Sequence, residues 1–211
     1  MKVCIIGNGL VSLTLAKALV NKGIKVDIFY KNKRNNYDQA RTLGISRSNT
    51  DFFNENILNI KKIIWKINDI KIFTENSHDD EILNFNDSDK PLFSIVQNYQ
   101  LYKMLDKELR KNKFFNYKKN INFNSLIKKN YKLIINCDKN NEITKKFFSS
   151  RLEKNYNSFA YTTLLEHKSV RKNDSAIQIF TNKGPVAFLP ISSTKTSIVC
   201  SLRVSNKKIE I

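Results

Sequence analysis

Two glycines near the N-terminus are the residues whose spacing is most specific for chemistry. Gly7 and Gly9 follow a short apolar run, and apolar residues at helical spacing begin at Leu10. The first glycine allows a tight strand-to-helix turn, and the second lets the backbone approach a ligand without a Cβ in the way. The helix start then offers free N–H groups to an anion. The segment through Leu10, Val11 and Ser12 therefore predicts a site for the pyrophosphate of a dinucleotide cofactor.

The surrounding elements support this prediction, because a glycine pattern is specific only between a strand and a helix. Residues 2–6 read as a buried strand, residues 10–21 as a helix and residues 24–29 as a second strand. Ser12 stands where the pattern G-x-G-x-x-G has its third glycine, and it is small enough for close helix–strand packing. The alternative is a glycine turn in an α/β fold that binds no nucleotide.

The end of the second strand departs from the pattern. An Asp or Glu is expected there to hold the ribose hydroxyls, but the residue is Tyr30. Asp27 lies three residues earlier, and we expect its side chain to point elsewhere. Tyr30 can still donate one hydrogen bond, so it is predicted to contact the cofactor.

The rest of the chain divides into a mixed part and a strand-rich part. Ser48 is expected to cap a helix whose face carries Phe53, Ile57, Ile60 and Ile64, and alternation from residue 64 to 76 predicts strand structure. A helix is expected over 98–111 and a strand over 131–137. The last third predicts four strands, at 159–167, 176–181, 186–191 and 197–204. Strands that follow a β-α-β start indicate an α/β chain with a second, antiparallel layer.

Composition restricts the class of partner. The 211 residues are 41% hydrophobic and 27% charged, which is typical of a globular domain. The formal net charge is +18, but the lysines are scattered, and basic charge alone is a weak indication of nucleic-acid binding. We expect no nucleic-acid partner and a weak attraction to an anionic membrane surface.

Disulfides, metals and membrane spans are not expected. Cys4, Cys137 and Cys200 lie in separate apolar runs without C-x-x-C spacing, which predicts buried reduced thiols. The run His78-Asp-Asp-Glu81 reads as a solvated loop and not as a metal site. No stretch reaches the ~18 apolar residues of a membrane helix, and residues 2–30 read as folded structure and not as a signal peptide. A cytoplasmic protein is therefore expected.

Four segments together resemble the ubiquinone-biosynthesis hydroxylases, which are para-hydroxybenzoate-hydroxylase-like FAD monooxygenases. The resemblance runs from Val3 to Val204. Its segments are the β-α-β unit, Arg41-Thr-Leu-Gly-Ile-Ser46, Val96-Gln97-Asn98, and the pair TNKGPVAFLPIS (181–192) and TSIVCS (196–201). The last pair is the most specific, because plain NAD-binding folds have no such hairpin.

The resemblance implies a cofactor site. Extended FAD would have its pyrophosphate at the glycine segment, with Arg41 near the phosphates or the flavin linker. Gln97 and Asn98 would lie along the cofactor, and Asp138, at the end of a further strand, would also contact it. Lys31 and Arg34 are nearby charges that we interpret as solvated loop residues.

The resemblance also implies a fold and a reaction. Residues 1–63 and 92–150 would form the FAD-binding domain, and residues 64–91 and 151–211 part of a β-sheet substrate domain. The reaction would hydroxylate the ring of a polyprenylated phenol in ubiquinone biosynthesis, with NAD(P)H as reductant. The enzyme would lie at the periphery of the inner membrane or in a biosynthetic complex. Phe188, Leu189 and Pro190 would be near the ring.

Two departures from the family leave alternatives open. Asp138 is followed by Lys139 where relatives have glycine, and the family's C-terminal Gly-Asp motif is absent from these residues. The chain is then the N-terminal half of the enzyme or a non-catalytic, flavoprotein-like member of a ubiquinone-biosynthesis complex. A simple NAD(P)-dependent reductase is a third reading, but the strand-rich last third disfavours it.

Overall fold

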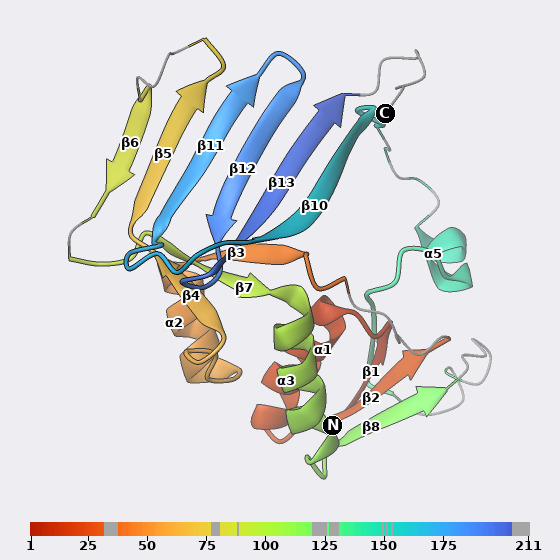
Figure 1. Ribbon diagram of the computed structural model, residues 1–211. Coiled ribbons are helices and arrows are strands. Elements are labelled where there is room, and N and C mark those ends of the chain that lie inside the picture. Colours follow the sequence, from red (N-terminus) through yellow and green to blue (C-terminus); the bar gives the residue numbers. More distant parts are fainter. Residues whose placement is uncertain are drawn as a thin grey trace. The chain divides into compact units, whose positions relative to one another are not determined.

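The computed structural model forms two compact units (Figure 1). The first comprises Met1–Tyr37, Phe52–Ile60 and Asn98–Leu152, and the second Asp38–Asp51, Lys61–Gln97 and Glu153–Ile211. The residues that the structure describes are 1–31, 38–76, 81–87, 89–119, 126, 131–148, 150, 152 and 154–203. Arg34 and His78 to Asp80, which were considered from the sequence, lie outside them.

The first unit contains a parallel four-stranded sheet in the order β8-β2-β1-β9. Its elements are β1 (Lys2–Ile6), α1 (Leu10–Asn21), β2 (Lys25–Tyr30), α3 (Asn98–Arg110), β8 (Phe115–Lys119), β9 (Leu133–Asn136) and the short helix α5 (Glu142–Phe147). The predicted β-α-β start is confirmed, and α1 begins at Leu10 as expected.

The core of this unit explains why these residues form these elements. Val3 to Ile6 are all fully buried, as in a parallel strand covered on both faces. Leu101, Leu105 and Leu109 of α3 are buried at a spacing of four residues, so they form one apolar stripe. Helices α1 and α3 pack against each other.

The second unit contains two sheets. The larger has the order β10-β13-β12-β11-β5-β6, in which only the β11–β5 pair is parallel. The smaller is antiparallel, in the order β3-β7-β4. The strands are β3 (Thr42–Ser46), β4 (Ile64–Ile67), β5 (Asp69–Thr74), β6 (Leu83–Asn86), β7 (Phe93–Gln97), β10 (Ser158–Glu166), β11 (Ser175–Thr181), β12 (Gly184–Pro190) and β13 (Lys195–Arg203).

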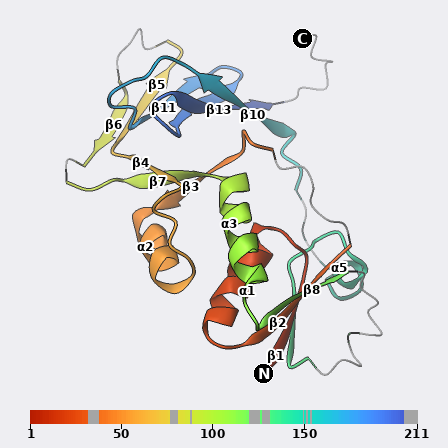
Figure 2. The same ribbon diagram turned by 60° about the horizontal axis from the view of Figure 1, so that its bottom comes forward.

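The smaller sheet lies against one face of the larger (Figure 2). Ile67 and Ile95 of the smaller sheet form a buried cluster with Ala176 of the larger. Trp65 packs on this cluster, and its indole Nε1–H donates to the Asn173 carbonyl at 2.6 Å. The predicted strand-rich layer is therefore confirmed, with its core between two sheets.

The helix predicted from Ser48 differs from the structure. Helix α2 (Arg47–Asn56) ends before Ile60, and Ile64 begins β4. The Asn54 side-chain oxygen accepts the Ile60 N–H at 2.8 Å, which holds the chain in a turn after the helix. At the start of the helix, the Ser46 hydroxyl accepts the Asn49 N–H at 3.3 Å, so Ser46 takes the place expected for Ser48.

The compact units also differ from the predicted domain boundaries. Segments 38–51, 61–63 and 92–97 were assigned to the FAD-binding domain, but they belong to the second unit. The reason is strand pairing, because β3 and β4 both pair with β7.

Candidate cofactor-binding site

The turn after β1 strongly favours glycine at position 7. Gly7 has a φ of +104°, and a Cβ there would lie 3.3 Å from the Asp138 Cβ and from the Cys137 carbonyl carbon. The Gly7 N–H donates to the Phe29 carbonyl at 2.8 Å, which ties the turn to β2. The turn therefore brings the backbone at the ends of β1 and β9 together.

The start of α1 leaves backbone donors free. Gly9 is the N-cap, its carbonyl accepts the Leu13 N–H at 3.0 Å, and no side chain caps the helix. The first turn contains no acidic residue. The N–H groups of Leu10, Val11 and Ser12 have no partner within the helix, and they lie at its positive dipole end. This donor set fits a pyrophosphate.

Ser12 contributes to this turn through its backbone. Its side chain is 1% exposed and lies on the same buried face as Ala16 and Val20. Its hydroxyl has no hydrogen-bond partner among the described residues. The side chain therefore fills the small-residue packing position, and the N–H is the group presented to a ligand. Val11, by contrast, is 71% exposed at the open side of the turn.

The end of β2 is closed by an aromatic pair. The Tyr30 ring meets the Tyr117 ring edge to face, with centroids 5.7 Å apart. The Tyr117 hydroxyl donates to the Asp106 carboxylate at 2.5 Å. Burial, with help from Asp106, raises the pKa of Tyr117. No carboxylate of β2 therefore takes the place that would hold a ribose, and a Tyr30–cofactor contact stays a prediction.

Asp27 points away from this end of the sheet, as expected. It is 1% exposed and pairs with Lys2 Nζ at 2.9 Å, and the Tyr131 hydroxyl donates to it at 2.6 Å. Asn116 Nδ2 donates at 3.4 Å. Burial alone would raise the pKa of Asp27, but the hydrogen bonds from Tyr131 and Lys2 outweigh it, so the pKa is lowered. Asp27 is a structural, fully paired carboxylate.

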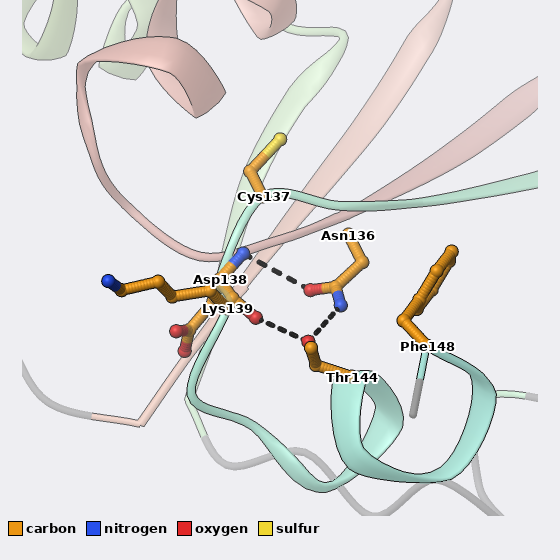
Figure 3. A pocket seen from close by; sticks show the side chains of 6 residues that line it. All are labelled: Asn136, Cys137, Asp138, Lys139, Thr144 and Phe148. Atoms are coloured by element: carbon orange, nitrogen blue, oxygen red, sulfur yellow. Dashed lines mark hydrogen bonds between the residues drawn. The ribbon is translucent and has the colours of Figure 1, made fainter. Parts of the chain in front are cut away.

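The end of β9 borders a hollow of about 340 Å³. It is lined by Asn136, Cys137, Asp138, Lys139, Thr144 and Phe148 (Figure 3). Asn136 Oδ1 accepts the Asp138 N–H at 3.1 Å, and its Nδ2 donates to the Thr144 hydroxyl at 2.6 Å. That hydroxyl donates to the Asp138 carbonyl at 2.8 Å, so the network fixes the strand end against α5.

Sequence reasoning missed α5 and the residues that it brings to the hollow. One local signal was present, because Asn141 precedes Thr144 by three residues. The Asn141 side chain accepts the Thr144 N–H at 2.9 Å, which is N-cap geometry. Thr144 and Phe148 reach the hollow only because this cap starts the helix there.

The remaining predicted contacts lie in different units. Gly7, Gly9, Tyr30 and Asp138 belong to the first unit, as does Asn98, whose Oδ1 is buried without a partner among the described residues. Arg41 and Gln97 belong to the second. Arg41 is exposed, and Gln97 Nε2 donates to the Gln39 carbonyl at 3.1 Å. The cofactor contacts of Arg41, Gln97, Asn98 and Asp138 stay predictions.

The three residues proposed near the substrate ring do not share a face. Successive side chains of a strand point to opposite sides of its sheet. Leu189 packs on the cluster between the two sheets. Phe188 and Pro190 therefore lie on the opposite face, so the three cannot form one patch.

Among the described residues, the cysteines form no disulfide and the acidic side chains form no metal cluster. Cys4 is buried, whereas Cys137 and Cys200 are half-buried, and all three are free thiols. Within the described ranges, no three His, Cys, Asp or Glu side chains gather as metal ligands would. In the same ranges, no helix has the length and apolar character needed to cross a membrane.

Solved structures share this fold, although no protein-family model and no curated protein matches the sequence. HpxO from Klebsiella pneumoniae, complexed with FAD and uric acid, matches with a TM-score of 0.74 at 13% identity, over 100% of this chain and 58% of its own. The p-nitrophenol 4-monooxygenase PnpA from Pseudomonas putida DLL-E4 matches at 0.74 and 12%, over 97% and 58%. PqsL from Pseudomonas aeruginosa, a probable FAD-dependent monooxygenase, matches at 0.71 and 11%, over 96% and 60%.

These similarities define the class of fold. The chain has the para-hydroxybenzoate-hydroxylase-like fold of FAD-dependent monooxygenases, with a parallel sheet and antiparallel sheets as predicted. It spans about 60% of the length of PqsL and 58% of HpxO and PnpA. Identities of 11–13% show the fold alone.

Proposed function

We propose that the chain is the FAD-binding part of an aromatic-ring monooxygenase. The observation that carries this proposal is the Gly7 turn, which leads into a helix start with free N–H groups and no acidic residue. The shared fold supports the choice of FAD over other dinucleotides, because HpxO with this fold is complexed with FAD.

The residues of this chain would bind and orient the cofactor. The N–H groups of Leu10, Val11 and Ser12 bind the pyrophosphate. Tyr30 donates one hydrogen bond to the ribose, and Arg41 and Gln97 hold the cofactor further along. When bound, FAD supplies the redox and oxygen chemistry that places a hydroxyl group on the ring. The protein contributes position and exclusion of water.

The substrate that we propose is a polyprenylated phenol of ubiquinone biosynthesis, with NAD(P)H as the reductant. The hairpin over 181–192 supports this choice, because it carries the most specific resemblance to that family. A polyprenyl chain dissolves in the bilayer, and the net charge of +18 favours an anionic membrane surface. The protein would then work at the membrane periphery, alone or in a biosynthetic complex.

A pair of glycine variants tests the cofactor site. Gly7→Ala places a Cβ in a left-handed residue and against Asp138 and Cys137, so FAD affinity should fall by more than about tenfold. Gly23→Ala is the matched control, because Gly23 also has a positive φ but nothing lies within 4 Å of its added Cβ. Affinity is measured by titrating the 211-residue chain with FAD and following flavin fluorescence. Equal affinities in both variants, or no binding by the wild type, contradict the proposal.

A non-catalytic role is the second candidate function. The observation that favours it is the Tyr30–Tyr117 pair at the place expected for a ribose-binding acid. A full-length protein that binds FAD but neither oxidises NAD(P)H nor hydroxylates a prenylated phenol supports this role. Hydroxylated product excludes it.

A further inference from the structure

The C-terminal end of α5 exposes several large apolar side chains. Ile143 anchors this helix, because it is buried in one cluster with Cys4 of β1. Phe147 lies one turn further along the same side of the helix, but its ring is 56% exposed. The Phe148 ring is 58% exposed, and Leu152 is 99% exposed. The core of the first unit therefore does not cover this end of α5.

The charge at this end of the helix is positive. Lys145 and Lys146 lie in the last turn of α5, and both are exposed. Lys146 Nζ lies 5.5 Å from the centre of the Phe147 ring. Glu142 is the acidic residue of this helix, and it lies in the first turn, where it complements the helix dipole. The dipole also accounts for the two lysines, but it does not account for exposed rings beside them.

A second exposed ring, on α2, has the opposite surroundings. Phe52 is 55% exposed, which is close to the value for Phe147. The nearest charged side chains along α2 are those of Asp51 and Glu55, and both are exposed. The two rings therefore have similar exposure and opposite local charge. An anionic surface would attract the end of α5 and repel this part of α2.

We propose that the end of α5 docks on an anionic lipid bilayer. Phe147, Phe148 and Leu152 enter the boundary between headgroups and acyl chains, and Lys145 and Lys146 pair with lipid phosphates. The lysine stems lie along apolar surface while their ammonium groups stay at the headgroups. Leu152 favours a bilayer over single-stranded RNA, because an aliphatic side chain offers no ring on which a base can stack. The choice of a bilayer rests on the proposed function, in which the substrate dissolves in the membrane.

Vesicle binding by the 211-residue chain tests this surface. The chain should bind phosphatidylcholine vesicles that contain about one third phosphatidylglycerol at least about tenfold more tightly than pure phosphatidylcholine vesicles. Phe147→Ser combined with Phe148→Ser should weaken binding to the anionic vesicles by about tenfold, by loss of the inserted rings. Lys145→Gln combined with Lys146→Gln should weaken it by about tenfold or more, by loss of two charges. Equal binding to both kinds of vesicle overturns the proposal.

Two controls match these variants in chemistry but not in place. Phe52→Ser removes a ring of similar exposure, and Lys118→Gln combined with Lys119→Gln removes two adjacent exposed lysines at the end of β8. Both controls should bind the anionic vesicles within about threefold of the wild type. All substituted side chains are exposed, so a thermal melt should show that each variant folds. Equal losses in the variants and their controls reduce the attraction to net charge alone and overturn the surface.

Fluorescence tests whether the rings enter the bilayer. Trp65 is the one tryptophan of the chain, so Phe147→Trp adds a single reporter at the end of α5. Its emission should shift to shorter wavelength when anionic vesicles are added, because the indole leaves water. The emission of Phe52→Trp should not shift. An unshifted Phe147→Trp on bound vesicles contradicts insertion and overturns the proposal.

Two further measurements separate this inference from its alternatives. A single-stranded oligonucleotide that binds more tightly than the anionic vesicles, and whose binding the same variants abolish, would assign the surface to nucleic acid and overturn the proposal. FAD titration separates the surface from the proposed function. FAD binding without vesicle binding overturns the docking surface alone. Vesicle binding through these residues without FAD binding defeats the proposed FAD site and leaves the surface in place.

Discussion

The cluster around Asp27 and the turn around Gly7 lie on neighbouring strands of one sheet. The polar groups of the cluster are hydrogen-bonded within the protein, whereas those of the turn are not. Asp27 is buried and receives hydrogen bonds from Lys2, Tyr131 and Asn116. The turn leaves the N–H groups at the start of α1 without partners in the helix. Polar groups that are hydrogen-bonded within the protein contribute to folding, whereas N–H groups left free at an open turn are available to a ligand.

Removing the Asp27 carboxylate should give the largest effect, and on stability alone. Asp27→Ala leaves the Tyr131 hydroxyl and Lys2 without their partner, and the loss of one member of a buried pair costs roughly 3–5 kcal/mol. We expect the free energy of unfolding in urea to fall by about 3 kcal/mol, because Lys2 remains half-exposed. FAD affinity of the folded variant should stay the same. If the variant keeps its stability but loses FAD affinity, then Asp27 contributes to ligand binding and not to folding, which contradicts the account.

Acid should weaken the same cluster. The pKa of Asp27 in the folded chain is lowered from its ordinary 3.8. Its contribution to stability is therefore present above about 3.8 and is lost as pH falls through the lowered folded value. Urea unfolding from pH 6 to pH 3 should show a steeper loss of stability for the wild type than for Asp27→Asn. Parallel profiles for the two proteins would argue against a paired carboxylate.

An acidic residue at the end of β2 should increase the affinity of the glycine turn for FAD. Tyr30→Glu removes an edge-to-face contact worth about 0.5–1.5 kcal/mol of stability. It also supplies the carboxylate that a ribose diol requires. We expect FAD affinity to rise by about tenfold, as for one charge-assisted hydrogen bond. Tyr30→Phe is the control, and the loss of one hydrogen bond to the ribose, worth about 1 kcal/mol, should lower FAD affinity by roughly fivefold. An affinity for Tyr30→Glu below that of the wild type would place the ribose elsewhere.

Ser12 should give the smallest effect and the opposite sign. Its hydroxyl is buried without a partner among the described residues, and such a group costs about 1–3 kcal/mol. Ser12→Ala should therefore raise the free energy of unfolding by about 1 kcal/mol and leave FAD affinity unchanged. Lower FAD affinity in this variant would mean that the hydroxyl itself contacts the phosphate.

Periodicity predicted the elements that local sequence determines. The strands β1 and β2, helices α1 and α3 and the four C-terminal strands follow from patterns of two or 3.6 residues. Strand β6 was missed because its Leu83 and Phe85 are about half exposed, so no buried pattern marks it. Helix α2 was extended too far because Ile60 and Ile64 continue its spacing, and only the Asn54 side chain shows where it ends.

At the candidate site too, features set by adjacent residues were predicted from the sequence, and features set by distant residues were not. The glycine turn depends on residues adjacent in sequence, so the pattern predicted it. Two partners of Asp27, Tyr131 and Asn116, are 104 and 89 residues away in sequence. The Tyr30–Tyr117 contact likewise depends on the pairing of β2 with β8. Phe188 and Leu189 are adjacent in sequence, but the alternation of side chains along β12 places them on opposite faces of the sheet. Long-range pairing is therefore what the sequence alone could not supply.

Amide chemical shifts of the ¹⁵N-labelled chain test the central claim most directly. We predict that addition of FAD moves the N–H signals of Leu10, Val11 and Ser12 strongly, because hydrogen bonds to phosphate deshield amide protons. The signals of Val186 and Ile198 in the second unit should move less. Saturable FAD binding that leaves the three helix-start amides in place would contradict the account.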